Sequence, residues 1–357
     1  MKQKRVSYAD LAKYCNFSKT TISRYFSNPD SLTIENQEKI RNAVKVLGYQ
    51  ENKIAKMLPS GHTEFIGLIV PNLFMNYYFE IMHHLLSTYS TYGYKFLVFE
   101  CHSSIEEERQ YINEMIAYNV EGIITLSHII PSKEYASYDI PVVAIEREDD
   151  YISSVHNDNY MGGIQATSLL YKSGCDALFF IDSTPVGATK SSYYSTDTRS
   201  YQYGRLNGFR YVCKNCNVEN EEIIRYLGEE YSEYYKGISE IIDELAVKYP
   251  NRKKGIFCAN DTFANIALVH LMRKYGKFPD DFRLVGYDGS PIAEQAIVPI
   301  STVRQQVDKI TQSAMDLLIK QIKAKDQRIP ETVPIQHEII PPILMNRATT
   351  DDSYFIE

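Results

Sequence analysis

The chain opens with apolar positions spaced three and four residues apart, which is the spacing of short helices. Ser7 followed by Asp10 is a typical helix start and predicts a first helix over about 7–14. Ser18 begins a second helix, KTTISRYF, about four residues later, and a third begins at Thr33, runs as IENQEKIRNAVKVL and ends at a glycine. The first two helices therefore have the spacing of a helix-turn-helix.

The second helix carries short hydrogen-bond donors and cations on the side away from its apolar positions. Ile22 and Phe26 lie one turn apart and face inward. The outward side chains can hydrogen-bond base edges or phosphates in a major groove. We therefore expect these residues of the head to contact DNA: Ser7, Ser18, Lys19, Thr20, Thr21, Ser23, Arg24, Asn28 and Tyr49.

From Glu64 onward, short β-rich runs alternate with amphipathic helical runs. The runs are FIGLIVP, KFLVFE, GIITLS and PVVAIE, and then ALFFID, GIFCAND and FRLVGYDG. Helices are expected between them over 77–91, 106–118, 161–172, 205–215, 233–248 and 262–275. This rhythm predicts an α/β body of two parallel sheets covered by helices, one sheet in each of two lobes. Ligands of such sheets bind at the carboxyl ends of the strands.

Composition supports this division, because 357 residues exceed one ordinary core and imply two or three domains. Residues 1–61 hold eleven Lys and Arg against five acids, so the head carries +6 while the whole chain carries −7. A basic head on an acidic body is typical of a protein whose head alone approaches a polyanion. A solvated basic surface without a partner is the alternative interpretation of the charge.

Several classes of protein are excluded by pattern. No apolar stretch approaches the roughly 20 residues that a membrane span needs, and the start MKQKRVSYADLAKYC does not resemble a secretory leader, so we expect a cytoplasmic protein. The six scattered cysteines are expected to be reduced thiols. The chain has no nucleophile elbow, phosphate-binding loop or zinc-protease motif, and His83–His84 and the Cys213/Cys216 pair have no further ligands nearby in sequence. We expect no enzyme activity, cofactor or metal.

Four segments carry a resemblance to a known family. VSYADLAKYCNFSKTTISRYFSN, IRNAVKVLGY and NKIAKML, followed by the strand IGLIVP, resemble the lactose-repressor (LacI/GalR) family of bacterial transcription regulators, and the match runs in order across nearly the whole chain. The resemblance implies a helix-turn-helix head and a two-lobed body like that of periplasmic binding proteins. Its boundaries are a head at 1–50, a hinge at 51–61, an N-lobe at about 62–156 plus 292–322, a C-lobe at about 157–291 plus 323–345, and a tail at 346–357.

In the family, a hinge helix folds in the DNA minor groove, where a leucine opens a central base step. Leu58 stands at the matching place, although Pro59 follows it where a small or polar residue is common, and Asn16 replaces the usual glycine of the first turn. The alternative to a DNA-binding hinge helix is that Ile54 and Leu58 are merely the apolar side of an amphipathic linker. The resemblance adds these expected DNA contacts: Asn52, Lys53, Ala55 and Leu58.

The strand ends of the body supply the candidate effector site. Arg205, in GRLNGF, resembles the position where relatives hold the effector with a guanidinium. The expected effector contacts are Asn72, Tyr77, Glu100, Ser127, Glu146, Arg147, Arg205, Asn260, Asp261 and Asp288. Donors and acceptors flanked by an aromatic face suit a sugar or sugar phosphate, because each buried hydroxyl needs a partner. Asp261 and Asp288 could equally cap the helices that follow them, and Tyr77 could be part of the pocket wall and not a stacking platform for the ligand. Glu146 stands where relatives mostly carry aspartate.

These expectations combine into a ligand-responsive transcription regulator, most simply a repressor. A homodimer would place one head on each half of a pseudo-palindromic operator. We expect the protein to be associated with the nucleoid when it is bound to the operator, and we expect no membrane partner. Two alternatives stay open: a sugar-binding transport or sensor protein without DNA function, and a regulator that its effector activates as a co-repressor.

Overall fold

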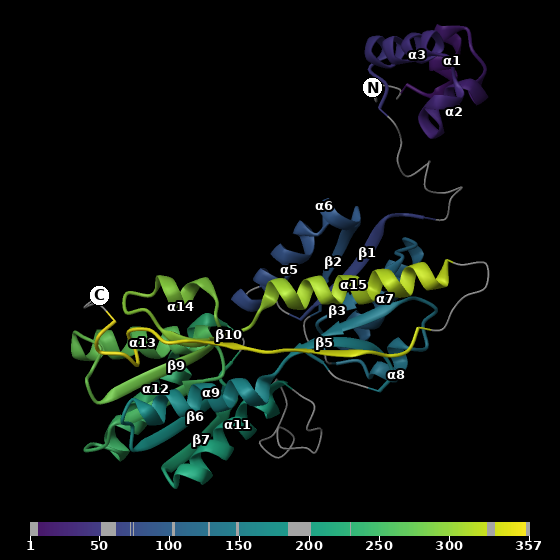
Figure 1. Ribbon diagram of the computed structural model, residues 1–357. Coiled ribbons are helices and arrows are strands. Elements are labelled where there is room, and N and C mark those ends of the chain that lie inside the picture. The colour runs from purple at the N-terminus through teal and green to yellow at the C-terminus, as the bar shows by residue number, and fades with distance from the viewer. Residues whose placement is uncertain are drawn as a thin grey trace. The chain divides into compact units, whose positions relative to one another are not determined.

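The computed structural model describes residues 6–50, 62–71, 73, 75–101, 104–127, 129–147, 150–184, 201–228, 230–326 and 333–354 (Figure 1). The chain divides after Thr63 into two compact units, the head and the body. The expected ligand contacts that lie outside the described residues are Asn52, Lys53, Ala55, Leu58 and Asn72.

The head is a three-helix unit, as the sequence predicted. Its elements are α1 (Tyr8–Cys15), α2 (Lys19–Ser27), the short 3-10 turn η1 (Pro29–Ser31) and α3 (Ile34–Leu47). Fully buried Leu11, Ile22 and Ile40 bring one apolar side chain from each α-helix into its core. Aromatic rings close one side of this core, where Phe26 stacks on Tyr8 with ring centroids 5.3 Å apart.

Local side-chain bonds set the helix ends of the head. Ser7 and Asp10 form a reciprocal capping box at α1, and the Ser18 hydroxyl accepts a hydrogen bond from the Thr21 amide at 3.1 Å at the start of α2. Asn16 adopts the left-handed conformation, with φ of 57°, between the two helices. Asparagine is one of the few residues that tolerates this conformation, so it can replace a glycine in the turn.

The N-lobe contains a six-stranded sheet of parallel strands in the order β11-β5-β4-β3-β1-β2. Its strands are β1 (Phe65–Val70), β2 (Lys95–Glu100), β3 (Gly122–Thr125), β4 (Val142–Ile145), β5 (Ser153–Asn157) and β11 (His337–Ile340). Its helices are α5 (Asn76–Ser87), α6 (Tyr89–Tyr92), α7 (Ile105–Ala117), α8 (Ser132–Tyr135) and α15 (Val307–Lys325). Two apolar clusters, one on each face of this sheet, form its core.

The C-lobe contains the second six-stranded sheet, in the order β12-β10-β9-β8-β6-β7. Its strands are β6 (Ala177–Ser183), β7 (Glu219–Arg225), β8 (Lys254–Cys258), β9 (Phe282–Asp288), β10 (Ser301–Arg304) and the antiparallel β12 (Ile343–Met345). Its helices are α9 (Asn159–Lys172), α11 (Tyr201–Cys216), α12 (Tyr231–Lys248), α13 (Asp261–Tyr275) and α14 (Pro291–Gln295). The helices cover both faces, which explains the continuous burial of β6, β8 and β9.

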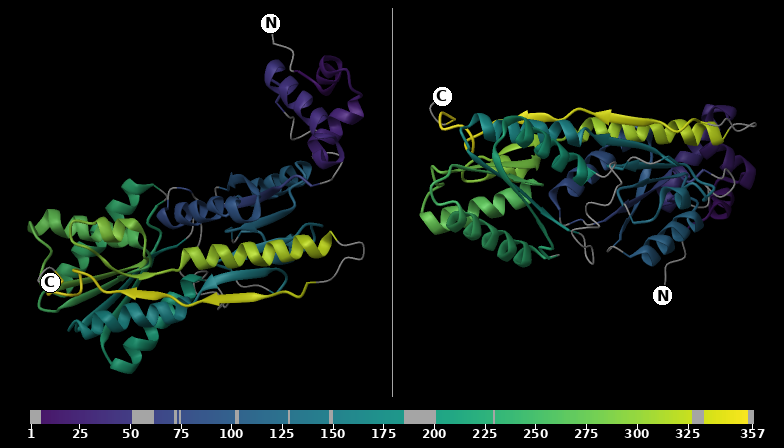
Figure 2. Two further views of the ribbon diagram at one scale, coloured as in Figure 1. Left: turned by 45° about the horizontal axis from the view of Figure 1, so that its top comes forward. Right: turned by 90° about the horizontal axis from the view of Figure 1, so that it is seen from below.

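The division into lobes differs from the expected one near the C-terminus. Strand β10 pairs in the C-lobe although 292–322 was assigned to the N-lobe, and β11 pairs with β5 in the N-lobe although 323–345 was assigned to the C-lobe. The last strands (yellow in Figure 2) lie end to end along the two sheets. These strands are short edge additions outside the βαβ rhythm, so the sequence pattern did not locate them.

The chain crosses between the lobes three times, at 157–159, 304–307 and 340–343. Each crossing follows the carboxyl end of a strand, so the strand ends of both sheets meet where the lobes join. None of the helices among the described residues is long and apolar enough to span a bilayer.

Candidate functional site

Arg205, on α11, is the centre of the polar cluster between the lobes. Its side chain is almost completely buried; its Nε donates to Asn159 Oδ1 at 2.9 Å and its Nη1 to the carbonyl of Ala259 at 2.5 Å. The guanidinium lies 3.7 Å from the centroid of the Tyr287 ring and 3.6 Å from the Asp288 carboxylate. A buried guanidinium needs such partners, because an unpaired buried charge is strongly unfavourable. Arg205 is therefore held in one position.

Glycine allows the two helices that carry these residues to approach closely. A Cβ at Gly163 of α9 would lie 2.3 Å from the carbonyl oxygen of Arg205, which is backbone and cannot rotate away. The absence of a side chain at this position thus lets α11 lie against α9 and places Arg205 beside Asn159 at the start of α9.

Two carboxylates face this cluster from strand ends of opposite lobes, and both have unusual backbone conformations. Glu146 follows β4 with φ of 61°, and Asp288 ends β9 with φ of 106°. Positive φ is uncommon for residues other than glycine and is found disproportionately at functional sites. The Glu146 carboxylate accepts hydrogen bonds from the amide of Asn157 at 3.1 Å and from Asn159 Nδ2 at 3.3 Å.

Burial controls the protonation of the acids in the C-lobe half of the site. Burial raises the pKa of Asp288 well above the ordinary range, and this effect outweighs the opposing charge of Arg205. Burial likewise raises the pKa of Asp261, although its carboxylate accepts hydrogen bonds from Ser290 N at 2.7 Å and Ser290 Oγ at 3.1 Å. The two acids also interact with each other, so each disfavours ionisation of the other.

A pocket of about 70 Å³ lies among these groups. We call it the cleft pocket and define it by its lining residues: Met75, Tyr77, Tyr78, Glu146, Arg205, Asn260 and Asp288. Asn260 also caps α13, where its Oδ1 accepts from Phe263 N at 2.8 Å. The Tyr77 hydroxyl is buried and has no hydrogen-bond partner of good geometry among the described residues, and burial raises its pKa. The pocket thus combines aromatic walls with one guanidinium, one amide and two carboxylates.

The structure brings five of the expected effector contacts together in the cleft pocket, namely Tyr77, Glu146, Arg205, Asn260 and Asp288. Four others do not line it, and each has a partner elsewhere. Glu100 accepts from Leu73 N, and Ser127 donates to Glu108 at 2.6 Å. Arg147 Nη1 donates to the carbonyl of Ile130 at 2.6 Å, and Asp261 binds Ser290.

The residues that hold the cleft pocket together were missed by the sequence analysis. Gln305 Nε2 donates to Asp288 Oδ1 at 2.9 Å, and Asn157 Nδ2 donates to the Tyr287 hydroxyl at 2.6 Å. Both residues stand at crossings between the lobes. The polar run HNDNY and the position directly after STVR were the available signals, but each required recognition of the short strand before it. Met75 and Tyr78 were missed because only Tyr77 was selected from that segment.

Comparisons with known proteins agree with this architecture. Residues 173–350 match the family model described as a periplasmic binding protein-like domain. The ribose operon repressor of Halalkalibacterium halodurans is 28% identical over 319 residues, covering 88% of this chain and 90% of its own. A lac repressor dimer bound to operator and the anti-inducer ONPF has the same fold, with a TM-score of 0.78 at 19% identity, covering 97% of this chain and 99% of that one. The chain belongs to the lactose-repressor family.

A further relative within this fold was solved with a sugar. The periplasmic binding protein/LacI transcriptional regulator of Alkaliphilus metalliredigens, complexed with D-xylulofuranose, is 25% identical, with a TM-score of 0.67 over 81% of this chain and 99% of its own.

The head of this lactose-repressor family member offers one exposed helical face for DNA. Lys19, Thr20, Ser23, Arg24 and Asn28 are exposed on or directly after α2. The remaining expected contacts have structural partners. The Ser7 and Ser18 hydroxyls serve as helix caps, half-buried Thr21 lies 2.9 Å from the Ser18 hydroxyl, and Tyr49 packs on Tyr8 and Phe26. Among the described residues of the head, the α2 face thus holds the expected contacts whose side chains are exposed and take no part in capping or core packing.

Proposed function

We propose that this protein is a transcriptional repressor whose head binds an operator and whose cleft pocket binds a neutral sugar. The observation that carries the choice of effector is that Arg205 is the one cation among the residues lining the cleft pocket, and that burial raises the pKa of the facing Asp288, so the site disfavours negative charge. Hydroxyl groups both donate and accept, so they can satisfy a carboxylate and a guanidinium side by side. A phosphate would bring up to two negative charges into a buried site that already favours the neutral form of Asp288, at a large electrostatic cost.

The second arginine near the cleft does not change this balance. The Arg147 guanidinium donates to the backbone carbonyls of Ser127 and Ile130 and does not line the cleft pocket. The family resemblance favours the same class of effector, since relatives include a ribose operon repressor and a regulator crystallised with D-xylulofuranose. We therefore favour a neutral monosaccharide and reject the sugar phosphate alternative left open by the sequence.

The small volume of the cleft pocket implies that the lobes move. Its 70 Å³ is far below the roughly 300 Å³ or more that is usual for small-molecule sites, so a sugar must open the cleft to enter. Asn157 and Gln305 stand at the crossings and bind Tyr287 and Asp288. A ligand that rearranges Asp288 thus acts directly on the segments about which the lobes turn.

Operator binding would use the α2 face together with the hinge predicted from the sequence. Arg24, Lys19 and Ser23 supply a cation or a donor for bases and phosphates, while Leu58 is expected to open a base step in the minor groove. If sugar binding moves the N-lobes of two protomers, the paired hinges separate and the minor-groove contacts are lost. A sugar that weakens operator binding 100-fold must prefer the low-affinity state by about 2.7 kcal/mol, an ordinary coupling energy.

A homodimer accounts for the apolar surface of the N-lobe. Phe79 is 58% exposed and Leu86 46% exposed, and their seven-residue spacing places both on one side of α5. Strand β2 is an edge strand, and its apolar run FLVF is nowhere fully buried. An exposed apolar edge strand is an aggregation hazard unless it is covered. A second copy of the chain packed against α5 and β2 would cover it.

A thermal-shift screen tests the sugar assignment. Neutral pentoses and hexoses should raise the melting temperature of the full chain by mass action, and their phosphates should not. A matched Arg205→Lys variant keeps the positive charge but loses the planar guanidinium with its paired donors, so sugars should no longer raise its melting temperature. Stabilisation by phosphates alone would refute the neutral-sugar proposal, and failure to bind any DNA with half-site symmetry would favour a sugar-binding protein without DNA function.

A further inference from the structure

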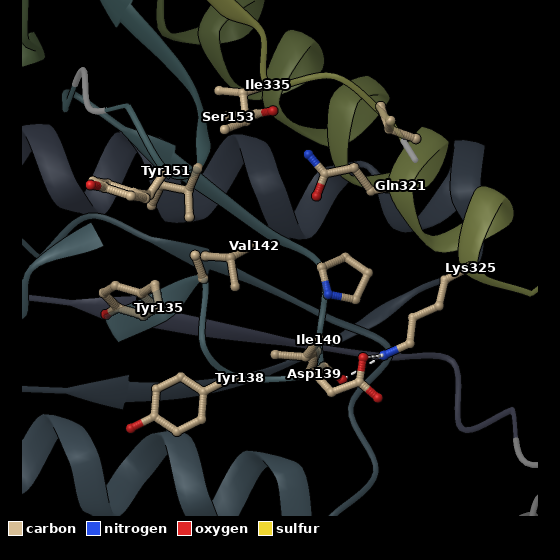
Figure 3. A pocket seen from close by; sticks show the side chains of 14 residues that line it. Tyr135, Tyr138, Asp139, Ile140, Val142, Tyr151, Ser153, Gln321, Lys325 and Ile335 are labelled. Atoms are coloured by element: carbon tan, nitrogen blue, oxygen red, sulfur yellow. Dashed lines mark hydrogen bonds and ion pairs between the residues drawn. The ribbon is translucent and has the colours of Figure 1, made fainter. Parts of the chain in front are cut away.

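A second and larger cavity lies at the opposite end of the N-lobe sheet from the cleft pocket. It has a volume of about 590 Å³, and we call it the edge cavity (Figure 3). Val142 and Ser153, the first residues of β4 and β5, lie in its wall, together with residues of α8, the last turns of α15 and the segment before β11. Glu146 and Asn157 of the cleft stand at the other ends of β4 and β5. The same two strands therefore connect the two sites over about 10–13 Å.

The lining of the edge cavity is amphipathic. Figure 3 shows Tyr135, Tyr138 and Tyr151 on one side, and Gln321 and Lys325 of α15 on the other. Aliphatic side chains form much of the remaining wall: Ile140, Pro141, Val142, Ile152, Val333 and Ile335. Flat phenol rings and aliphatic groups favour an apolar ring, while the opposite side offers polar groups.

The charged side chains of the edge cavity stand at its solvent-exposed rim and add no net charge. They are Lys325 and the fully exposed Asp139, which form an ion pair of 2.7 Å. An ammonium donor beside a carboxylate acceptor matches two neighbouring hydroxyl groups, each of which donates and accepts. The Gln321 amide, which makes no hydrogen bond to another described residue, adds a further donor and acceptor on the same side.

We propose that the edge cavity is a second small-molecule site, for a neutral ligand that combines a flat apolar ring with neighbouring hydroxyl groups, as in an aryl glycoside. The ring lies toward Tyr138 and Tyr151, and the hydroxyls bind Asp139, Lys325 and Gln321. The volume of about 590 Å³ lies within the range of sites for ligands of this size.

Tyr135 couples this site to the cleft. Its side chain is fully buried directly behind the exposed lining of the edge cavity, and its hydroxyl donates to the fully buried carboxylate of Glu108. Ser127 Oγ donates to the same carboxylate at 2.6 Å, and Arg147 holds the carbonyls of Ser127 and Ile130. A ligand that repacks the cavity wall in front of Tyr135 therefore acts through this network on the loop after β3 that leads toward the cleft.

The chain has no tryptophan, so single-tryptophan variants report on each site separately. Tyr151→Trp keeps a flat ring in the edge cavity, and Tyr118→Trp, at a position 63% exposed outside the cavity, is the control. The probes are phenyl β-D-glucopyranoside, methyl β-D-glucopyranoside and phenol. The proposal expects phenyl glucoside to change the fluorescence of Tyr151→Trp saturably, at least tenfold more tightly than either other probe, with no response from Tyr118→Trp.

Matched variants decide where the probe binds. Asp139→Leu combined with Lys325→Met preserves volume at a surface ion pair and should weaken the response at least tenfold. Glu146→Gln in the cleft pocket should keep a saturable Tyr151→Trp response, and the coupling between the sites limits its effect to a shift of the midpoint. A response lost in Glu146→Gln would show that the cleft is the binding site, and one that survives in the Asp139/Lys325 double variant would show binding without the predicted polar contacts. Either result, or no saturable response to phenyl glucoside, overturns the proposal.

The coupling has its own reporter. Tyr78→Trp places the single tryptophan in the cleft pocket. With the cleft first saturated by a neutral monosaccharide from the thermal-shift screen, which excludes direct entry of the probe, it should still respond to phenyl glucoside with the same midpoint as Tyr151→Trp measured under the same conditions. Tyr135→Phe keeps the buried ring behind the wall of the edge cavity but removes the hydroxyl, so it should retain the Tyr151→Trp response and abolish the Tyr78→Trp response. A Tyr78→Trp response that persists in Tyr135→Phe contradicts the coupling route but leaves the edge site intact.

Discussion

The DNA-binding face of the head and the cleft pocket of the body are built in opposite ways. The α2 face consists of exposed side chains on one short helix. Other residues of the same helix, such as Ile22, make its contacts with the core. The cleft pocket consists of buried charged side chains that come from strand ends and helices of both lobes, as Arg205, Glu146 and Asp288 do. The head thus separates binding from folding, whereas in the cleft the same side chains serve both.

This difference predicts how each region tolerates substitution. An exposed side chain can be removed at little cost in stability, because water replaces it. Removal of a buried charged partner leaves the other groups unpaired in a medium that solvates them poorly. Substitutions in the cleft should therefore change ligand affinity and stability together, and substitutions on the α2 face should change DNA affinity alone.

The largest effect is expected for Arg205→Ala. It should abolish the sugar response and lower the free energy of unfolding of the body by about 3–5 kcal/mol, because Asp288, Asn159 and the Ala259 carbonyl lose their partner. Chemical denaturation and sugar titration measure the two changes. Arg252→Ala, which breaks surface ion pairs, is the control and should cost at most about 1 kcal/mol. Equal costs for the two variants would contradict the comparison.

Arg24→Ala should lower operator affinity by about 1–3 kcal/mol and leave the melting temperature and sugar affinity unchanged, because Arg24 is exposed. Lys39→Ala, on α3 and paired with Glu35, is the matched control and should change operator affinity less. Quantitative DNA binding at fixed salt measures both. Equal weakening on operator and unrelated DNA would reduce Arg24 to a phosphate contact.

The acids of the cleft predict a pH dependence of stability. Because burial raises the folded-state pKa of Asp288 above its unfolded value near 3.9, the folded state binds more protons between the two values. The free energy of unfolding should therefore fall as pH rises through this window, by at most about 1.4 kcal/mol per pH unit for this group. Asp288→Asn removes the titrating group, so denaturation of both proteins from pH 4 to 9 should show a shallower fall in the variant. Parallel curves would mean that the pKa of Asp288 is not raised.

The smallest effect is expected for Ser18→Ala at the start of α2. Loss of the bond to the Thr21 amide should destabilise the head by about 1 kcal/mol. Ser23→Ala, at an exposed position inside the same helix, should have little effect on stability. Thermal denaturation followed by a signal from the head measures the stability of both variants. An equal loss of stability for Ser23→Ala would remove the capping explanation.

The head and the cleft also differ in how much of each could be predicted from the sequence. The head was predicted closely, because its caps Ser7 and Ser18 and its turn at Asn16 act within a few residues along the chain. The two parallel sheets were also predicted, because buried strands and amphipathic helices alternate in the sequence. The family resemblance and the strand-end rule together selected Arg205 and Asp288.

The parts that were missed depend on contacts between distant segments. Gln305 reaches Asp288 only because the short strand β10 joins the C-lobe sheet, and β11 joins the N-lobe by pairing with β5, where His337 and Ser154 are 183 residues apart in the chain. Strand-end position also could not distinguish Glu146, which lines the cleft pocket, from its neighbour Arg147, which turns to the carbonyls of the loop before α8. Such choices depend on side-chain packing that no local pattern records.

The most direct measurement is operator affinity with and without a saturating neutral sugar, in the wild-type chain and in Arg205→Lys. The account predicts at least a tenfold loss of affinity on sugar addition for the wild type, no change for the variant, and equal affinity of both proteins without sugar. A sugar effect of the same size in the variant, or none in a wild-type protein whose cleft is saturated, would contradict control of the head through the cleft pocket.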